Sequence, residues 1–260
     1  MNEESFQLLR AAVFLTALGV GVLLERAVPH ARLRPAWRAN LGLWAVNAGL
    51  VGVICGACAC TVAGWASKEG MGLLNVLGAP ALLGIAATVL VLDAVSYAWH
   101  RANHRLAFLW RFHRVHHRDG SFNVSTALRF HPGEVLLSLP LRLAAVVLLG
   151  APILGVAVFE AVFMCANVLE HGNFNLPRRL ERVLSLVLVT PALHRWHHSR
   201  EPSELNTNFG TVVTLWDRAL GTFQNADSRA LVTTGVPGVQ REWRSLQIAI
   251  IEPFRASARA

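Results

Sequence analysis

Charged residues are scarce in this chain of 260 residues. They make up 15% of the sequence, against 53% hydrophobic residues, and the mean hydropathy is +0.42. Soluble domains carry roughly 25% charged residues, so this chain has too little charge to cover a water-facing surface. The scarcity argues against a soluble protein and predicts a membrane protein.

The charge that is present is mostly of one sign. The formal net charge is +8, and nearly all of the basic residues are arginines in loops between apolar segments. A basic soluble domain would suggest a nucleic-acid partner. Loop arginines beside apolar segments instead fit anionic lipid headgroups and a fixed orientation in a membrane. We therefore expect the lipid bilayer as a partner and no nucleic acid.

Several motifs are missing, and each absence excludes a class of site. Three of the four cysteines lie in CGACAC at residues 55–60, but no second Cys-x-x-Cys pair exists, so neither a thiolate zinc site nor a disulfide framework is expected. The chain has no His-Glu-x-x-His motif of a zinc hydrolase and no convincing Gly-x-Gly-x-x-Gly nucleotide motif. Its start, MNEES, is acidic where a secretory signal is basic, so the first apolar segment is expected to remain as a membrane helix.

Four apolar segments are long enough to enter a bilayer. The turn residues GAPILG at 150–155 predict that the last segment, too long for one span, folds as a helical hairpin. The predicted fold class is therefore all-α, an integral membrane helical bundle with about four to five membrane-embedded helices. The segments cover about residues 6–24, 41–66, 73–99 and 135–169.

Loop charge predicts how these helices are oriented. Arginines crowd residues 25–40 and 100–130, whereas the short 67–72 loop is neutral. Positively charged loops stay in the cytoplasm, and a hairpin over 135–169 returns the chain to the same side. The remainder, 172–260, is amphipathic, and RRLERVLSLVLVTPALH at 178–194 is typical of an interfacial helix.

Histidine is the polar residue that clusters on this cytoplasmic side. Ten of the eleven histidines lie between residues 100 and 198. Eight of them are in HRANH and in two copies of His-x-x-His-His, and His131 and His171 stand alone. Offsets of three and four share one helix face, so each motif can direct its imidazoles at a metal ion. Nine or ten histidines suffice for two ions with four to five ligands each, and imidazole suits iron, zinc, copper and nickel. The lone His30 is expected not to bind metal, whereas the motif residues are His100, His104, His113, His116, His117, His194, His197 and His198.

HRANH, HRVHH and HRWHH, in this order behind membrane segments, resemble the histidine boxes of the sterol desaturase / fatty acid hydroxylase superfamily of integral membrane di-iron enzymes. The motifs STALRFHPGE (125–134), EHGNFNLP (170–177) and NTNFGTVVTLWDRALGTF (206–223) are also similar to family signatures, and the resemblance covers about residues 80–225. It implies a cytosolic helical cap that holds two iron ions, which zinc can replace in a purified sample. It also implies O2 as a substrate and a separate electron donor, either a reductase, a ferredoxin or a cytochrome.

The resemblance assigns ligand positions to the eight motif histidines and to His171. His131 matches a histidine that is either a tenth ligand or a hydrogen-bond partner of one. Asn175 stands where some hydroxylases have a further histidine, and would hold a metal-bound water or cap a turn. Ligating imidazoles usually donate their second nitrogen to a carboxylate. The candidate carboxylates are Asp93, which lies seven residues before His100 and so on the same helix face, Glu134 and Glu170.

We expect a single membrane domain over residues 1–260, with anchor helices in 1–72, a catalytic region in 73–225 and a C-terminal tail in 226–260. The predicted function is O2-dependent hydroxylation of a sterol, acyl chain or ether lipid, or desaturation by the same metal cage. The active site would face the cytoplasm at a bacterial inner membrane. The alternative is a non-enzymatic membrane metal- or haem-binding protein, an electron carrier or metal transporter, which would need fewer histidines placed within the spans.

Overall fold

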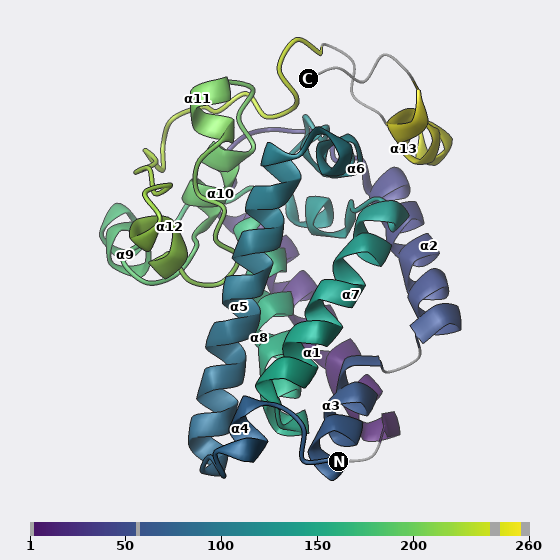
Figure 1. Ribbon diagram of the computed structural model, residues 1–260. Coiled ribbons are helices and arrows are strands. Elements are labelled where there is room, and N and C mark those ends of the chain that lie inside the picture. The colour runs from purple at the N-terminus through teal and green to yellow at the C-terminus, as the bar shows by residue number, and fades with distance from the viewer. Residues whose placement is uncertain (1–2, 56–57, 240–244, 256–260) are drawn as a thin grey trace.

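The computed structural model describes residues 3–55, 58–239 and 245–255 (Figure 1). These residues form helices and isolated β-bridges and no β-strand, which confirms the all-α fold class. The α-helices are α1 (Glu3–Ala27), α2 (Trp37–Cys55), α3 (Cys58–Lys68), α4 (Leu73–Val76), α5 (Ala81–Arg105), α6 (Ala107–His117), α7 (Pro132–Leu149), α8 (Ile153–Glu170), α9 (Arg178–Leu184), α10 (Pro191–His197), α11 (Pro202–Leu205), α12 (Leu215–Ala219) and α13 (Leu246–Ile251). Two short 3-10 helices are η1 (Val124–Leu128) and η2 (Glu252–Phe254).

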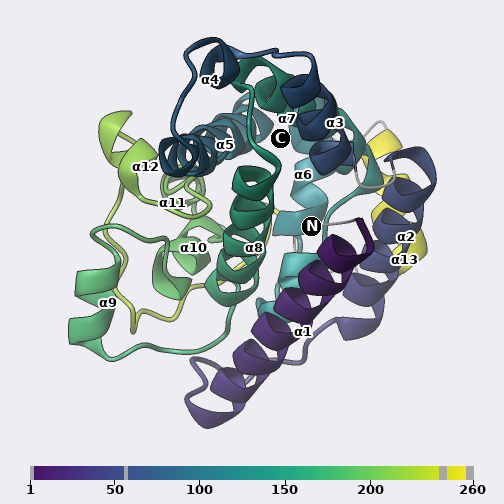
Figure 2. The same ribbon diagram turned by 90° about the horizontal axis from the view of Figure 1, so that it is seen from below.

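Among the described residues, four helices are long and apolar enough to cross a membrane: α1 from Leu8 to Ala27, α5, α7 and α8. Helix α8 packs against both α1 and α5, and α7 packs against α5 (Figure 2). Large apolar side chains on these helices point outward; Leu82 is 79% exposed and Leu148 is 74% exposed. Such a surface is stable against lipid tails and not against water, so the chain has the architecture of a membrane bundle.

One predicted span lies partly outside the described residues, and another begins later than predicted. The segment at 41–66 contains residues of α2 and of α3, and residues 56 and 57 between them are outside the described part of the chain. The span predicted from residue 73 begins instead at Ala81, because Gly78 adopts a left-handed conformation (φ +59°) and Pro80 caps the new helix. Glycine adopts positive φ without a steric penalty, which separates the short α4 from α5.

The predicted hairpin is present as α7 and α8. Gly150 ends α7 in the left-handed conformation (φ +69°), and Pro152 caps α8. A side chain at Gly150 would also come within 2.7 Å of the Met71 carbonyl oxygen, so both its backbone and its surroundings require glycine. At this end of the bundle the core contains Leu92, Val146, Leu149, Val156 and Phe159.

The other end of the bundle carries the cap. Helices α6, α10 and α11 lie there, and α10 packs on the end of α8 (Figure 1). The interfacial helix predicted over 178–194 is interrupted: α9 ends at Leu184, and α10 starts at Pro191, a residue favoured in the first turn of a helix. The C-terminal helix α13 packs on α2, where Leu43 and Ala249 are fully buried.

Candidate metal centre

Nine histidines gather into two groups at the cap end of the bundle. Within each group, one nitrogen of every imidazole lies within 4.8 Å of the others. Nitrogen ligands lie about 2.1 Å from a metal such as zinc, so this spacing allows all members to share one ion. The five-imidazole group contains His100, His104, His113, His117 and His197, and the four-imidazole group contains His116, His171, His194 and His198.

Each His-x-x-His-His motif divides its histidines between the two groups, and the division is reversed from one motif to the other. The outer histidines of the motif on α6 join the five-imidazole group, and those of the motif on α10 join the four-imidazole group. The middle residues, His116 and His197, each join the other group. The rings of His117 and His198 stack between the groups with centroids 4.1 Å apart. Each motif therefore contributes to both sites.

Two imidazoles are fixed by backbone carbonyl groups of one loop. The Nδ1 atom of His100 donates to the carbonyl oxygen of Phe209 at 2.9 Å, and Nδ1 of His197 donates to that of Thr207 at 2.7 Å. A neutral imidazole carries only one N–H, so these bonds leave the lone pair on Nε2. Both Nε2 atoms then face the other imidazoles of the five-imidazole group, where they could bind a metal ion.

Two further imidazoles are oriented in the same manner. His171 donates from Nδ1 to the carbonyl oxygen of Asn167 at 2.6 Å, and His113 donates from Nδ1 to the Glu134 carboxylate at 2.8 Å. Asn103 donates to the same Glu134 oxygen at 3.0 Å. Glu134 thus lies where a carboxylate would orient a ligating imidazole and raise its basicity.

The inward-facing nitrogens fit a cation. Nε2 of His171 lies 3.0 Å from Nε2 of His116 and 2.9 Å from Nε2 of His194, although its own proton is already on Nδ1. Within the described part of the chain, the buried Nε2 atoms of His100 and His197 have no hydrogen-bond partner. A metal ion shared by each group would satisfy these lone pairs together, so the residues present fit two ions.

Burial favours the neutral form of six of these imidazoles, which is the form that binds metal. Removal from water lowers the pKa of His171 to about 4 and that of His197 to about 3, although each Nδ1–H donates to a backbone carbonyl group. Four more grouped histidines outside the spans have a pKa well below the usual value. The larger cause is burial and the smaller is the charge of neighbouring imidazoles; the four are His116, His117, His194 and His198.

A second carboxylate lies beside the four-imidazole group. Glu170 ends α8 and is 3% exposed, and its Oε1 atom lies 3.9 Å from Nε2 of His194 and 4.0 Å from Nδ1 of His171. Its Oε2 atom is buried and accepts no hydrogen bond from the described residues. A buried carboxylate without donors is costly unless a cation lies nearby, so Glu170 can serve the ion of this group.

Asp93 does not hydrogen-bond an imidazole in the described structure. Its Oδ1 atom accepts from the Thr211 hydroxyl at 2.9 Å and from the Val212 amide at 3.1 Å, and its Oδ2 atom accepts from the Trp216 indole at 2.9 Å. Asp93 thereby anchors to α5 the loop that carries the Phe209 carbonyl group. Its influence on the metal centre runs through that loop.

Asp217 closes the same loop. Its carboxylate accepts from the amides of Phe209 and Gly210 at 2.8 and 2.7 Å and from the Thr222 hydroxyl at 2.6 Å. Sequence reasoning missed Thr207 and Phe209, because they act through backbone oxygens that any residue possesses. Their only signal was the dense set of Asn, Gly and Asp residues in NTNFGTVVTLWD.

Two predicted site residues lie outside both groups. His131 caps α7, accepting at Nδ1 from the Gly133 amide at 2.9 Å and donating from Nε2 to the Ile250 carbonyl oxygen at 3.1 Å. Both of its nitrogens are therefore engaged away from the metal groups. Asn175 accepts at Oδ1 from Nδ1 of His30 at 2.9 Å, which joins the cap to the loop after α1.

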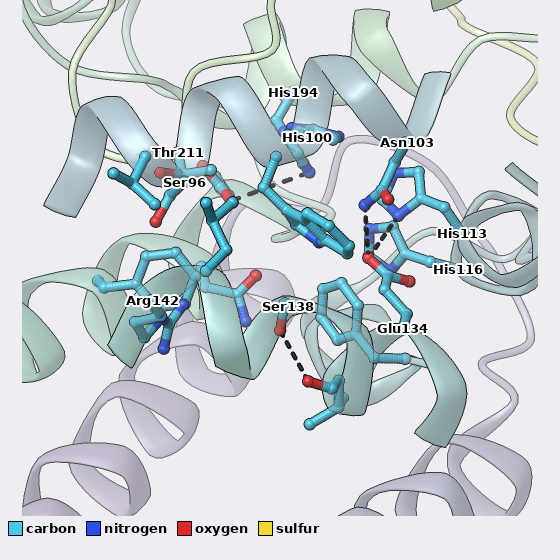
Figure 3. Close-up of a pocket in the computed structure, with 18 of the residues that line it drawn as sticks. Ser96, His100, Asn103, His113, His116, Glu134, Ser138, Arg142, His194 and Thr211 are labelled. Carbon is cyan, nitrogen blue, oxygen red and sulfur yellow. Dashed lines mark hydrogen bonds and ion pairs between the residues drawn. The ribbon is translucent and has the colours of Figure 1, made fainter. Parts of the chain in front are cut away.

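A cavity of about 230 Å³ extends from the imidazoles into the bundle between α5, α7 and α8 (Figure 3). Its walls are mainly apolar and include Trp99, Phe130, Leu141 and Phe163. Pockets that enclose small molecules are mostly apolar with a few placed polar groups. The imidazoles that line it are His100, His113, His116, His171 and His194.

Comparison with known proteins agrees with this site. The model of the fatty acid hydroxylase family matches residues 85–222. The ornithine lipid hydroxylase OlsE of Rhizobium tropici is 36% identical over 163 residues, which cover 63% of this chain and 48% of that protein. The cholesterol 25-hydroxylase of Homo sapiens is 30% identical over 140 residues, covering 53% of this chain and 50% of its own length.

The alkylglycerol monooxygenase of Danio rerio is 36% identical over 134 residues, covering 50% of this chain and 28% of its own length. The chain thus spans about half or less of the curated relatives it matches. No solved structure matches it significantly. The family match covers more than half of the chain and includes all nine grouped histidines, and the chain therefore belongs to the fatty acid hydroxylase family.

Proposed function

We propose that this chain is a membrane-bound di-iron oxygenase that hydroxylates an apolar lipid. The observation that carries the proposal is the pair of imidazole groups at one end of a mainly apolar cavity. The relatives named above are hydroxylases and monooxygenases of an ornithine lipid, a sterol and an alkylglycerol. A non-enzymatic metal carrier would need no cavity of this kind beside its ligands.

The chemistry requires an external reductant. Hydroxylation converts R–H, O2, two electrons and two protons into R–OH and H2O, and we expect a separate reductase, ferredoxin or cytochrome to deliver the electrons. When bound, the iron pair would supply the activation of O2. Imidazole ligands suit iron and zinc alike, so zinc in a purified sample would be a replacement.

The residues of this chain bind and position the substrate. Trp99, Phe130 and Leu141 form walls that accept an apolar chain and exclude water from the imidazole end. Hydrogen bonds from His100, His113, His171 and His197 hold the ligand geometry before any ion binds. Such preorganisation keeps the reacting carbon within ångströms of the metal pair, and this placement would decide between hydroxylation and desaturation. We favour hydroxylation because the named relatives are hydroxylases and monooxygenases.

The proposed orientation places the cap in the cytoplasm. The arginine-rich segments 25–40 and 100–130 lie at the cap end of the bundle, and the charge rule for the cytoplasmic side supports this orientation. Exposed Ser203 in the cap and exposed Ser67 at the far end of α3 offer a test. In a cysteine-free background, a membrane-impermeant thiol reagent should label Ser67→Cys in intact cells and Ser203→Cys only after lysis. The reverse pattern would overturn the orientation.

Lipid analysis tests the activity. Membranes that contain the expressed chain are incubated with O2 and a reductase system, and their lipids are compared by mass spectrometry with those from a matched His197→Ala variant. The proposal predicts a lipid that gains one oxygen atom with the parent chain only. A product that instead loses two hydrogen atoms would identify a desaturase, and identical lipids from the two chains would contradict the proposal.

A further inference from the structure

One cationic side chain lies in the membrane part of the cavity wall. Arg142 is on α7, ten residues after Pro132 and near the middle of a helix apolar enough to span the bilayer. Its side chain lines the cavity whose other end is formed by imidazoles (Figure 3). Arginine inside a membrane span is rare and costly, so its presence indicates a specific role.

Arg142 has no carboxylate of its own. Glu160 on α8 is the acidic residue that attracts it, but Glu160 already forms an ion pair of 3.0 Å with Arg10 of α1. The guanidinium of Arg142 instead lies over the Phe163 ring, 5.3 Å from its centroid. No hydrogen bond or ion pair of Arg142 occurs within residues 3–55, 58–239 and 245–255. The cations Arg10 and Arg142 and the anion Glu160 together leave a net positive charge beside the cavity.

Several other hydrogen-bond donors on the cavity wall already donate to oxygens of the protein. The Ser96 hydroxyl donates to the Leu92 carbonyl oxygen at 2.9 Å, and the Ser138 hydroxyl donates to that of Val135 at 2.8 Å. Among the remaining polar wall residues, Thr211 and Asn167 also donate to oxygens of the protein. Among the described wall residues at this end, Arg142 is therefore the charged hydrogen-bond donor that an incoming ligand meets.

We infer that Arg142 forms a subsite for an anionic oxygen group of the substrate. Guanidinium binds carboxylate and phosphate oxygens through charge-assisted, frequently bidentate hydrogen bonds, and these are strongest where water is excluded. The inference rests on the proposed function in one respect. If the chain hydroxylates a lipid, an acidic group held at Arg142 fixes which carbon of the lipid reaches the imidazoles. Glu134 and Arg142 are eight residues apart on α7, about 12 Å along the helix axis.

The ligand chemistry favours a carboxylate. A single guanidinium matches the charge and the two oxygens of one carboxylate, whereas a phosphate carries more charge and more oxygens than this wall can satisfy. The cavity of about 230 Å³ also has room for part of an acyl chain and not for a whole phospholipid.

Binding measurements without turnover test the inference. The full-length protein in detergent is titrated, in the absence of reductant, with hexadecanoic acid, its methyl ester and hexadecyl phosphate, each competing with a fluorescent fatty acid. The variants are Arg142→Met, which keeps the length and removes the charge, Arg142→Lys, which keeps the charge, and the control Arg26→Met, which removes an exposed arginine at the end of α1.

The parent chain and Arg26→Met should bind the acid about tenfold more tightly than the ester. Arg142→Met should lose this preference while it retains its affinity for the ester, and Arg142→Lys should keep part of the preference. A preference that survives in Arg142→Met, or tighter binding of the alkyl phosphate than of the acid by the parent chain, would overturn the inference. Because no reaction is required, a protein that binds in this way but never hydroxylates would refute only the proposed function.

Discussion

The two imidazole groups both contain histidines of the His-x-x-His-His motifs, and yet they differ in the number of imidazoles and in how these are held in place. The five-imidazole group has two ligands fixed by carbonyl groups of the 207–209 loop and a third fixed by Glu134. The four-imidazole group has one imidazole fewer and lines the cavity with His116, His171 and His194. It lies beside Glu170, whose Oε2 atom accepts no hydrogen bond from the described residues. The five-imidazole group lines it with His100 and His113 only. Two copies of one motif thus contribute to a group with more imidazoles and to a group that lines more of the cavity.

This difference suggests a division of roles. A metal site that has all of its protein ligands is closed, whereas a catalytic site keeps a position for water or substrate. The four-imidazole group is the site with such a position, next to the cavity. We therefore expect changes at the five-imidazole group to affect the retention of metal most, and changes at the four-imidazole group to affect the binding of small ligands as well.

The largest effect is expected when a middle histidine is removed. His197→Ala should lose the ion of the five-imidazole group and His116→Ala that of the four-imidazole group, so that each variant falls from two ions per chain to about one. Elemental analysis of the purified proteins measures the ratio. Two ions per chain in either variant would refute the assignment of that histidine.

The second-largest effect is expected on acidification, which should lower the stability of the folded metal-free protein. In the metal-free protein, the unfolded chain binds protons at these histidines below about pH 6.5, whereas folded His171 and His197 resist protonation until about pH 4 and about pH 3. Stability is therefore full above pH 6.5 and falls as the pH drops through this window, by on the order of 3 kcal/mol for each residue. Thermal unfolding in detergent measures it, and a melting temperature that stays constant between about pH 7 and about pH 4 would contradict the prediction.

The carboxylates should give smaller effects that differ between the groups. Glu134→Gln weakens the partner of His113 and should reduce metal affinity at the five-imidazole group by about 10- to 100-fold, as loss of an outer hydrogen-bond partner commonly does. Glu170→Gln removes the charge beside the four-imidazole group and should weaken that site instead. Chelator titrations of the two variants distinguish the sites, and equal loss from both groups in both variants would show that they are not independent.

The smallest effect is expected at His30. His30→Ala removes the hydrogen bond to Asn175 and should cost about 1 kcal/mol of stability with no loss of metal. Its melting curve and metal content can be compared with those of the parent chain. Loss of an ion would mean that the loop after α1 is part of the metal centre.

The sequence predicted the bundle and the histidine clusters because both depend on local pattern. Apolar length identified α1, α5 and the α7–α8 hairpin, and helical spacing identified the imidazoles that share a face. The start of α5 at Ala81 was not predicted, because the apolar segment from residue 73 continues on both sides of Gly78 and Pro80.

Hydrogen-bond partners were less predictable than the grouping of the histidines. Glu134 was expected beside a histidine and lies there, but Asp93 serves a loop more than one hundred residues later in the chain. Thr207 and Phe209 act through carbonyl oxygens, which no side-chain pattern reveals. The crossover of His116 and His197 between the groups depends on the relative placement of α6 and α10, which only the tertiary structure supplies.

A Mössbauer spectrum of the protein reconstituted with enriched iron tests the central claim most directly. Two ions in groups of unequal ligand number should give two quadrupole doublets of equal area, with two irons per chain. In His116→Ala the doublet of the four-imidazole group should disappear and the other should remain. A single iron per chain, or the loss of both doublets together from a variant that is still folded, would contradict the account of two distinct metal sites.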